Sequence, residues 1–316
     1  MKFMLDYTPP QFPCKISYEN KCILIGSCFT EQIGNRLHEL KFNVLQNPTG
    51  IVYDPLSIAD AIENCVSNKK LHDNDLYNNN GLWHSWKHHS RFSGVRKEDV
   101  LHRINESTKN AHRFLKEADW LMITLGSSFY YQLNESTVNV ANCHKAPAEM
   151  FTNKMLSAEQ ITSAIAEALN KLRDYNPQIN FLLTVSPVRH IKDGIVENNL
   201  SKSRLIEAVH ALAYKLERCY YFAAYELVVD VLRDYRFFDK DLVHPSSLAA
   251  DFVFDRFSEA AFDQQTRSIM NEIKKWSTAE KHRPFHSDSK AFKKFQEQQS
   301  LKITQLKAAY PFINFD

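Results

Sequence analysis

The sequence predicts an α/β protein in which helices cover both faces of a central parallel sheet. Three observations support this fold class. Short apolar runs recur along the chain, helical patterns separate them, and glycine, proline or polar residues bound each run. Strands buried on both faces have this continuous apolar character, and their alternation with helices is typical of parallel sheets.

The predicted elements follow from these patterns. Four apolar runs are predicted as buried strands, at 22–25, 120–125, 181–185 and 227–229, and a weaker fifth lies at 42–45. Helices are predicted at 30–42, 157–177 and 201–219, each with apolar residues spaced three or four apart. In the second helix Ser157 and Gln160 have the spacing of a capping box, and Pro177 marks its end.

Two regions depart from this alternation. Residues 73–107 are polar and rich in histidine and aromatic residues, which indicates an insertion or long loop over one edge of the sheet. From residue 271 onward the chain is strongly polar, as in a helical tail on the surface of a domain. We therefore expect one α/β domain over 1–270, with the insertion, followed by a helical tail over 271–316.

Composition excludes several classes of protein. The 316 residues are 44% apolar and 24% charged, with a formal net charge of +2, so charge predicts neither nucleic acid nor an anionic membrane as partner. No apolar run approaches the roughly 20 residues of a membrane helix, and the first residues do not resemble a signal peptide. A cytoplasmic protein, or a mature one without its leader, is expected. The six cysteines form no C-x-x-C pair, so reduced thiols are expected rather than disulfides or metal clusters.

Candidate catalytic residues follow the predicted strands, because open parallel sheets bind ligands at the carboxyl ends of their strands. Gly26, Ser27 and Cys28 follow the first run, where a helical pattern begins. A nucleophilic serine needs such a turn, and the N-terminus of a helix favours a developing oxyanion. Capping the helix is the alternative role for Ser27. Cys28 is a rival nucleophile, although an isolated cysteine beside a strand is more often a small buried apolar residue.

A serine hydrolase also needs a histidine and a carboxylate that orients it. Asp241 and His244 lie after the last predicted strand, on a loop before a helix that starts near Ser246. The same D-x-x-H spacing occurs at Asp99 and His102, but in a charged stretch that follows no predicted strand. Position along the chain therefore selects Asp241 and His244.

Six segments occur in a fixed order along the chain: IGSCF, NPTGIVYDP, TLGSSFYY, NCHKAP, SPVRH and RDYRFFDKDLVHPS. With these segments the chain resembles the GSCFA family of bacterial proteins, a branch of the SGNH/GDSL hydrolase superfamily, over about residues 20 to 290. The resemblance implies a flavodoxin-like three-layer α/β/α sandwich of the SGNH hydrolase type and an esterase reaction. It implies Ser27 as nucleophile, His244 as general base and Asp241 as the partner of His244.

The resemblance also implies an oxyanion hole, and here the chain departs from the superfamily. The superfamily uses the serine N–H, a glycine N–H of the second block and an asparagine side chain of the third. Ser27 and Gly50 match the first two, but the third block reads GSSF and lacks the asparagine. Ser128 or Asn142 is the candidate third donor. Loss of one such donor costs about 10²–10³ in rate, so this departure bears on activity.

Further residues are candidates for binding the substrate. They follow predicted strands or lie on the NCHKAP loop: Gly126, His144, Arg189 and His190. For His144 and the adjacent Lys145 the alternative is a solvated loop. Arg189 and His190 could bind an anionic or sugar substrate or form a structural ion pair.

The insertion has two functional interpretations. Trp83, Trp86 and Phe92 are predicted to form an aromatic wall against an apolar or sugar face, or else to anchor the insertion to the core. His84 and His88, four residues apart, could bind a metal from one helix face, but no third ligand is evident. No metal or organic cofactor is therefore predicted.

Together these features predict a serine esterase that hydrolyses O-acyl esters, with O-acetyl groups on carbohydrate preferred on superfamily analogy. The alternatives are an acyltransferase that uses the same triad and a catalytically silent module that binds glycans. Neither nucleic acid nor a membrane is an expected partner, and the sequence leaves the oligomeric state open.

Overall fold

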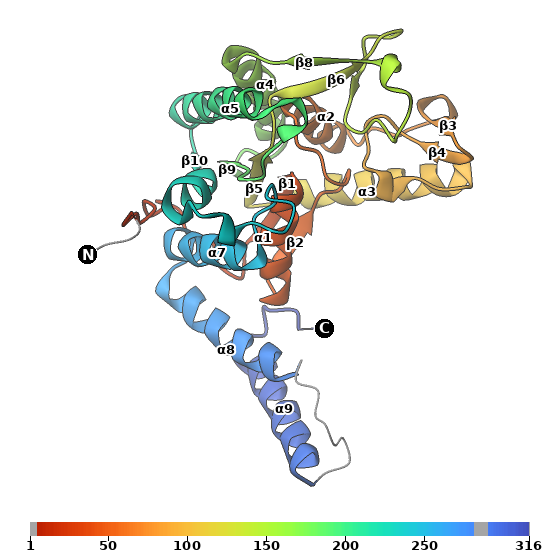
Figure 1. Ribbon diagram of the computed structural model, residues 1–316. Coiled ribbons are helices and arrows are strands. Elements are labelled where there is room, and N and C mark those ends of the chain that lie inside the picture. Colours follow the sequence, from red (N-terminus) through yellow and green to blue (C-terminus); the bar gives the residue numbers. More distant parts are fainter. Residues whose placement is uncertain (1–4, 281–289, 316) are drawn as a thin grey trace.

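A central parallel sheet organises the protein. The computed structural model describes residues 5–280 and 290–315 (Figure 1). Among these residues the main sheet has five strands: β1 (Lys21–Gly26), β2 (Asn43–Gln46), β5 (Trp120–Leu125), β9 (Asn180–Val185) and β10 (Cys219–Tyr221). Their spatial order is β10-β9-β5-β1-β2, which is the flavodoxin-like order 2-1-3-4-5 when these strands are numbered along the chain. The predicted fold class is confirmed.

Helices cover both faces of this sheet (Figure 1). On one face lie α1 (Cys28–Glu39) and α7 (Ser247–Ala261), and on the other lie α2 (Pro55–Val66), α3 (Lys97–Glu117), α4 (Ala158–Tyr175) and α5 (Ile195–Lys215). Side chains of β1 alternate between the two layers, because successive residues of a strand point to opposite faces. Leu24 joins the cluster with α1 and α7, whereas Ile23 and Ile25 join the cluster with the other four helices.

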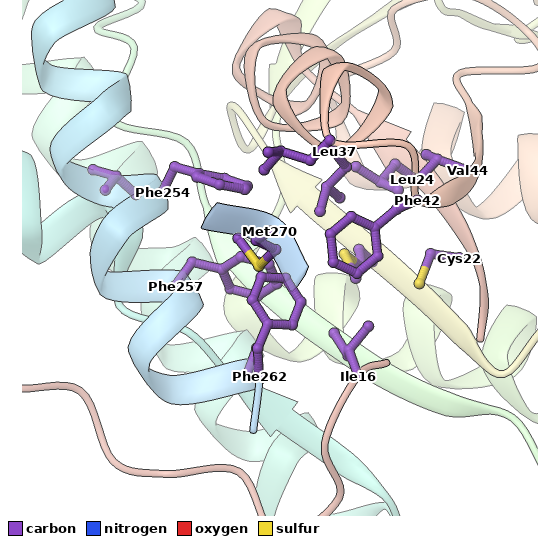
Figure 2. Close-up of a cluster of buried hydrophobic side chains, with 14 of the residues drawn as sticks. Ile16, Cys22, Leu24, Leu37, Phe42, Val44, Phe254, Phe257, Phe262 and Met270 are labelled. Atoms are coloured by element: carbon purple, nitrogen blue, oxygen red, sulfur yellow. The ribbon is translucent and has the colours of Figure 1, made fainter. Parts of the chain in front are cut away.

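The first of these clusters connects the sheet to the C-terminal helices. Figure 2 shows Leu24, Leu37 and Phe42 facing aromatic side chains of α7 and Met270 of α8 (Gln264–Glu280). Phe42 stacks on Phe262, with ring centroids 5.1 Å apart. Because Met270 belongs to this core, the first half of α8 is part of the packed domain.

One predicted strand is wrong. Residues 227–229 belong to a helical segment, since α6 (Ala224–Glu226) continues into a π-helix over Leu227–Leu232. The fifth strand of the sheet is instead β10, at the end of the predicted third helix. A short apolar run does not distinguish a strand from a buried helical turn by periodicity, and here the buried side chains of Leu227 and Val228 pack as part of a helix.

The predicted helices are present with shifted ends. Ser157 and Gln160 form the predicted capping box at the start of α4, which ends before Pro177. The helix α5 begins at Ile195, earlier than predicted, so its first turns lie at the carboxyl end of the sheet.

The predicted insertion is shorter than expected and contains regular secondary structure. It contains a hairpin of β3 (Tyr77–Asn79) and β4 (Leu82–His84), and residues 97–107 are the first turns of α3. A second sheet, which the sequence did not indicate, pairs β6 (Phe129–Leu133) with β7 (Asn139–Val140) and β8 (Phe151–Met155). Both additions lie beside the carboxyl end of the central sheet (Figure 1).

The C-terminal helices α8 and α9 (Lys290–Ala309) lie side by side and extend away from the sheet (Figure 1). Leu306 and Phe315 bring the end of the chain back to the core, and the ring of Phe315 meets Trp276 edge-on. Residues 281–289 of the predicted tail lie outside the described residues. No helix in the described ranges has both the length and the apolar character of a membrane span.

Candidate active site

Ser27 lies where β1 ends and α1 begins. Its N–H donates to the carbonyl oxygen of Thr124 at 3.2 Å, which joins the turn to the end of β5. The residue is 2% exposed, and among the described residues its hydroxyl oxygen has no hydrogen-bond partner. Ser27 is therefore the N-cap of α1 by position, but its side chain accepts no hydrogen bond from the helix.

Asp241 and His244 are paired on the loop before α7. Asp241 Oδ2 lies 2.7 Å from His244 Nδ1, and Asp241 Oδ1 accepts hydrogen bonds from the backbone N–H groups of Val243 and His244. These donors lower the pKa of Asp241 to about 2, with the two backbone groups as the largest cause. The carboxylate therefore stays ionised, and it orients the imidazole so that Nε2 is the nitrogen available for other contacts.

Arg189 connects this loop to the end of β9. Its N–H donates to the carbonyl oxygen of Val243 at 3.0 Å, and its guanidinium lies against the rings of Tyr235 and Phe238. The guanidinium also donates to the hydroxyl of Tyr235 at 2.8 Å. Arg189 thus makes structural contacts, and the ion pairs found among the described residues do not include it; its role toward substrate stays a prediction. The hydrogen bond from Arg189 to Val243 also holds the Asp241 loop at the carboxyl edge of the sheet, although residues 227–229 before this loop are helical and not a strand.

Ser27 and His244 follow different elements at the same end of the sheet, but they are not hydrogen-bonded. The side chain of His244 is 42% exposed, whereas the hydroxyl of Ser27 is buried. In proteins without bound substrate, catalytic hydrogen bonds are often long or unformed. The triad therefore stays a prediction, and it requires the hydroxyl and the imidazole to approach each other when substrate binds.

The predicted oxyanion donors have other partners here. The N–H of Ser27 binds Thr124, and the N–H of Gly50 donates to the carbonyl oxygen of Asn47 at 2.8 Å. Gly50 is also covered, since a side chain at this position would meet His89. Use of either N–H by an oxyanion requires that bond to open.

The two candidates for the third donor differ. The hydroxyl of Ser128 is buried and has no partner among the described residues. Asn142 accepts a hydrogen bond from the N–H of His144 at 2.9 Å through its side-chain oxygen. Ser128 thus has a hydroxyl to donate, while the bond of Asn142 fixes its loop through the oxygen and does not use its amide N–H groups.

His190 packs at the centre of this edge. Its ring stacks on Tyr53 with centroids 5.0 Å apart, and its Nε2 lies beside Gly126, where a Cβ atom would come within 3.2 Å. Burial, and then the charges of Lys202 and His244, lower the pKa of His190 to about 3. The imidazole is neutral at neutral pH, and its Nε2 has no partner in the described part of the chain. Gly126 has no side chain because Tyr53 and His190 occupy that space.

The aromatic insertion is held by contacts within its hairpin and with the segments around β7 and β8. Trp86 stacks on Tyr77 with centroids 3.5 Å apart and meets Phe151 of β8 edge-on, while His144 Nε2 lies 2.9 Å from the carbonyl oxygen of Ser85. These contacts attach Trp86 to the hairpin and to the second sheet, and both interpretations of the insertion stay predictions. Burial lowers the pKa of His144 to about 4, so it too is neutral at neutral pH.

Neither metal binding nor a thiol nucleophile gains support from the described residues. His84 ends β4, so it does not share a helix face with His88, and no group of three or more metal-ligating side chains lies together in the described ranges. Cys28 is half-buried, and burial raises the pKa of its thiol. All six cysteines, each in the described part of the chain, are free.

Sequence reasoning missed one group of residues, on the first turns of α5. Asn198, Ser201 and Lys202 are buried and bind the loops that follow β5 and β9. Their polar side chains at spacing i, i+3 and i+4 point toward the sheet, where a helix normally presents apolar residues. Polar residues on the face of the helix that packs against the sheet were therefore the sequence feature that could have revealed this group.

The chain is an α/β protein with a flavodoxin-like parallel sheet. Serine, histidine and aspartate residues follow elements at the carboxyl edge of this sheet. A model of the GSCFA family matches residues 21–257, and a model of the GSCFA domain protein, C-terminal domain, matches residues 273–316. The chain belongs to the GSCFA family.

Other comparisons add little. No curated protein matches the chain. A family 3 carbohydrate esterase from Talaromyces cellulolyticus aligns with 10% identity over 81% of this chain and 99% of its own, with a TM-score of 0.37. An acetyl xylan esterase from the rumen bacterium Butyrivibrio proteoclasticus aligns with 13% identity over 77% of this chain and 65% of its own, with a TM-score of 0.39. Likenesses this loose carry no argument about the site.

Proposed function

We propose that the protein is a serine esterase that cleaves small O-acyl esters with Ser27, His244 and Asp241. The observation that carries the proposal is the Asp241–His244 pair, with 2.7 Å between Oδ2 and Nδ1, on a loop that Arg189 joins to the end of β9. An exposed aspartate–histidine pair gains little stability, because water screens the attraction between surface charges. In a catalytic triad, an aspartate paired in this way orients the imidazole so that it can act as a base.

The proposed reaction has two steps. Ser27 Oγ attacks the carbonyl carbon of the ester while His244 Nε2 takes its proton, and the carbonyl oxygen becomes an oxyanion. The carbon–oxygen bond to the alcohol then breaks, and the alcohol leaves with the proton from His244. Water attacks the acyl-enzyme with the same base, and the acid and free Ser27 are released.

The surroundings of Ser27 favour a short acyl group. The hydroxyl is buried at the first turn of α1, so a bulky acyl group would have to displace packed protein. Acetyl is the smallest common acyl group, and carbohydrate as its carrier rests on the superfamily resemblance alone.

A panel of p-nitrophenyl esters of increasing acyl length tests the proposal. We expect acetate to be the preferred ester, and Ser27→Ala and His244→Ala to lose at least roughly 10²-fold in kcat/KM. Two matched controls should retain full activity: Ser157→Ala, at the N-cap of α4, and His102→Ala, which has the same D-x-x-H spacing. Activity that survives in both Ser27→Ala and His244→Ala would end the assignment.

A catalytically silent glycan-binding module is the second candidate. Two observations favour this module: the hydroxyl of Ser27 is buried, and the N–H groups of Ser27 and Gly50 already donate hydrogen bonds to backbone carbonyl oxygens. A serine-directed phosphonate separates the two: stoichiometric labelling that is lost in Ser27→Ala indicates an enzyme, whereas folded protein that binds acetylated oligosaccharides without being labelled indicates the module. Acetate release with and without added glycan acceptors then distinguishes a hydrolase from an acyltransferase.

A further inference from the structure

Lys202 is a buried cation at the centre of the sheet's carboxyl edge. The residue is 1% exposed, and its ammonium donates to the carbonyl oxygens of Gly126 and Ser186, the latter at 2.7 Å. Gly126 and Ser186 are the residues that directly follow β5 and β9. The ion pairs found among the described residues do not include Lys202. Burying an ammonium whose hydrogen-bond partners are neutral carbonyl groups opposes stability, so the arrangement calls for another reason.

The same face of α5 holds both loops at further points. Asn198 accepts the N–H of His190 at 2.8 Å, and Ser201 accepts the N–H of Ser128 at 2.8 Å. Together with the ammonium of Lys202, these side chains bind one loop after β5 and one after β9. The loops carry Ser128 and His190, whose side chains each have a buried polar atom without a partner in the described part of the chain.

The charge of Lys202 also reaches the start of α1. Burial raises the pKa of the Cys28 thiol, and the charge of Lys202 acts in the opposite direction as a smaller cause. Cys28 is the residue after Ser27, so the ammonium acts on the same helix N-terminus as the proposed nucleophile. The titratable groups that face Lys202 are Cys28 from α1, His190 from the loop after β9 and Tyr225 of α6, whose ring centre is 5.9 Å away.

We propose that Lys202 is a positioning residue of the active site: it holds the loops after β5 and β9 together and places a positive charge where the oxyanion forms. The inference rests on the proposed function. It supplies positive charge to a site that lacks the third-block asparagine, because the ammonium is fixed on the Gly126 carbonyl oxygen at the start of that block. Lys202 does not contact the substrate and acts through the backbone and its electrostatic field.

The test compares Lys202→Met, which removes charge and hydrogen bonds, with Lys202→Gln, which keeps an amide donor without charge. Lys215→Met, at the exposed end of the same helix, is the matched control. Two quantities are measured: the rate at which a phosphonate inactivates Ser27 between pH 6 and 9, and amide hydrogen exchange over 126–128 and 186–190. If Lys202→Met does not fold, Lys202→Gln decides by the same two measurements.

We expect Lys202→Met to slow inactivation by about tenfold or more at pH 6, a fraction of the effect of losing a direct oxyanion donor. Burial lowers the pKa of Lys202 to about 7, so the wild-type advantage should shrink as the pH rises to 9. Amide hydrogen exchange over 126–128 and 186–190 should increase in Lys202→Met. Lys202→Gln should keep these amides protected as in wild type but should still be inactivated more slowly by the phosphonate. A folded Lys202→Met with the wild-type rate and pH dependence overturns the proposal, and a Lys202→Gln with the wild-type rate overturns the role of charge.

The outcome also separates this inference from the proposed function. If the phosphonate does not label wild-type protein, the esterase proposal fails, and hydrogen exchange still tests whether Lys202 positions the two loops. If wild type is labelled and the Lys202 variants behave like Lys215→Met, only the inference about Lys202 fails.

Discussion

Replacing Ser27 by alanine distinguishes a nucleophile from a helix cap through stability rather than activity. A capping serine accepts a hydrogen bond from the first turn of its helix, and its loss costs about 1 kcal/mol. Ser27 accepts no such bond, and among the described residues its buried hydroxyl has no partner at all. A buried hydroxyl without a partner costs about 1–3 kcal/mol, so its removal should leave stability unchanged or raise it.

The structure provides a matched comparison for the size of the effect. Ser157 is the N-cap of α4, and its hydroxyl accepts the N–H of Gln160 at 3.2 Å within a complete capping box. We expect Ser157→Ala to lose about 1 kcal/mol. After a small loss of packing contacts, Ser27→Ala should change the free energy of unfolding by about 0 to +2 kcal/mol. The two variants should therefore differ by roughly 2–6 °C in Tm for a chain of this size.

Thermal unfolding followed by circular dichroism measures the difference, together with esterase activity of both variants. The reasoning predicts that Ser27→Ala is inactive but at least as stable as wild type, whereas Ser157→Ala is active but less stable. If Ser27→Ala loses as much stability as Ser157→Ala, the serine acts as a cap and the argument from its unpartnered hydroxyl is refuted.

Three further predictions follow from the same contacts. Asp241→Asn should lower kcat by about 10²–10⁴, because it removes the acceptor that orients His244. The Tm should change little, because the pair is exposed. Steady-state kinetics would show an undiminished kcat if the pair were only a surface contact. Arg189→Ala should lower kcat roughly tenfold by loosening the loop of His244. The control is Arg236→Ala, which should have wild-type kcat because Arg236 is exposed on that loop and pairs with Asp234. Equal kinetics of the two variants would remove the positioning role of Arg189. Burial lowers the pKa of His88 and His144 to about 4 and of His190 to about 3, so the folded chain binds fewer protons than the unfolded chain, whose histidines have a pKa of 6.5. Stability should therefore fall as the pH drops from about 6.5 to 4, only partly offset by Asp54, whose pKa burial raises to about 6; a Tm at pH 4.5 equal to that at pH 7 would contradict this sign.

The sequence predicted the parts of the fold that depend on local pattern. The strands β1, β5 and β9 appear as apolar runs because they are buried on both faces, and the start of α4 is visible because Ser157 and Gln160 satisfy its first N–H groups locally. The π-helix at Leu227–Leu232 was mistaken for a strand because its apolar run is too short to show a period. The position of Ser27 at the start of α1 was also readable, since a glycine and a polar residue end an apolar run there.

By itself, then, the sequence determined the strand-and-helix alternation and the residues that follow each strand. Only the tertiary structure decided what those residues contact. The stacking of His190 on Tyr53, the contacts of Arg189 with the loop of His244, and the ammonium of Lys202 between two strand ends all join segments distant along the chain. The physical reason is that periodicity records which face of an element is buried, whereas the partner of a buried polar group depends on how distant elements pack.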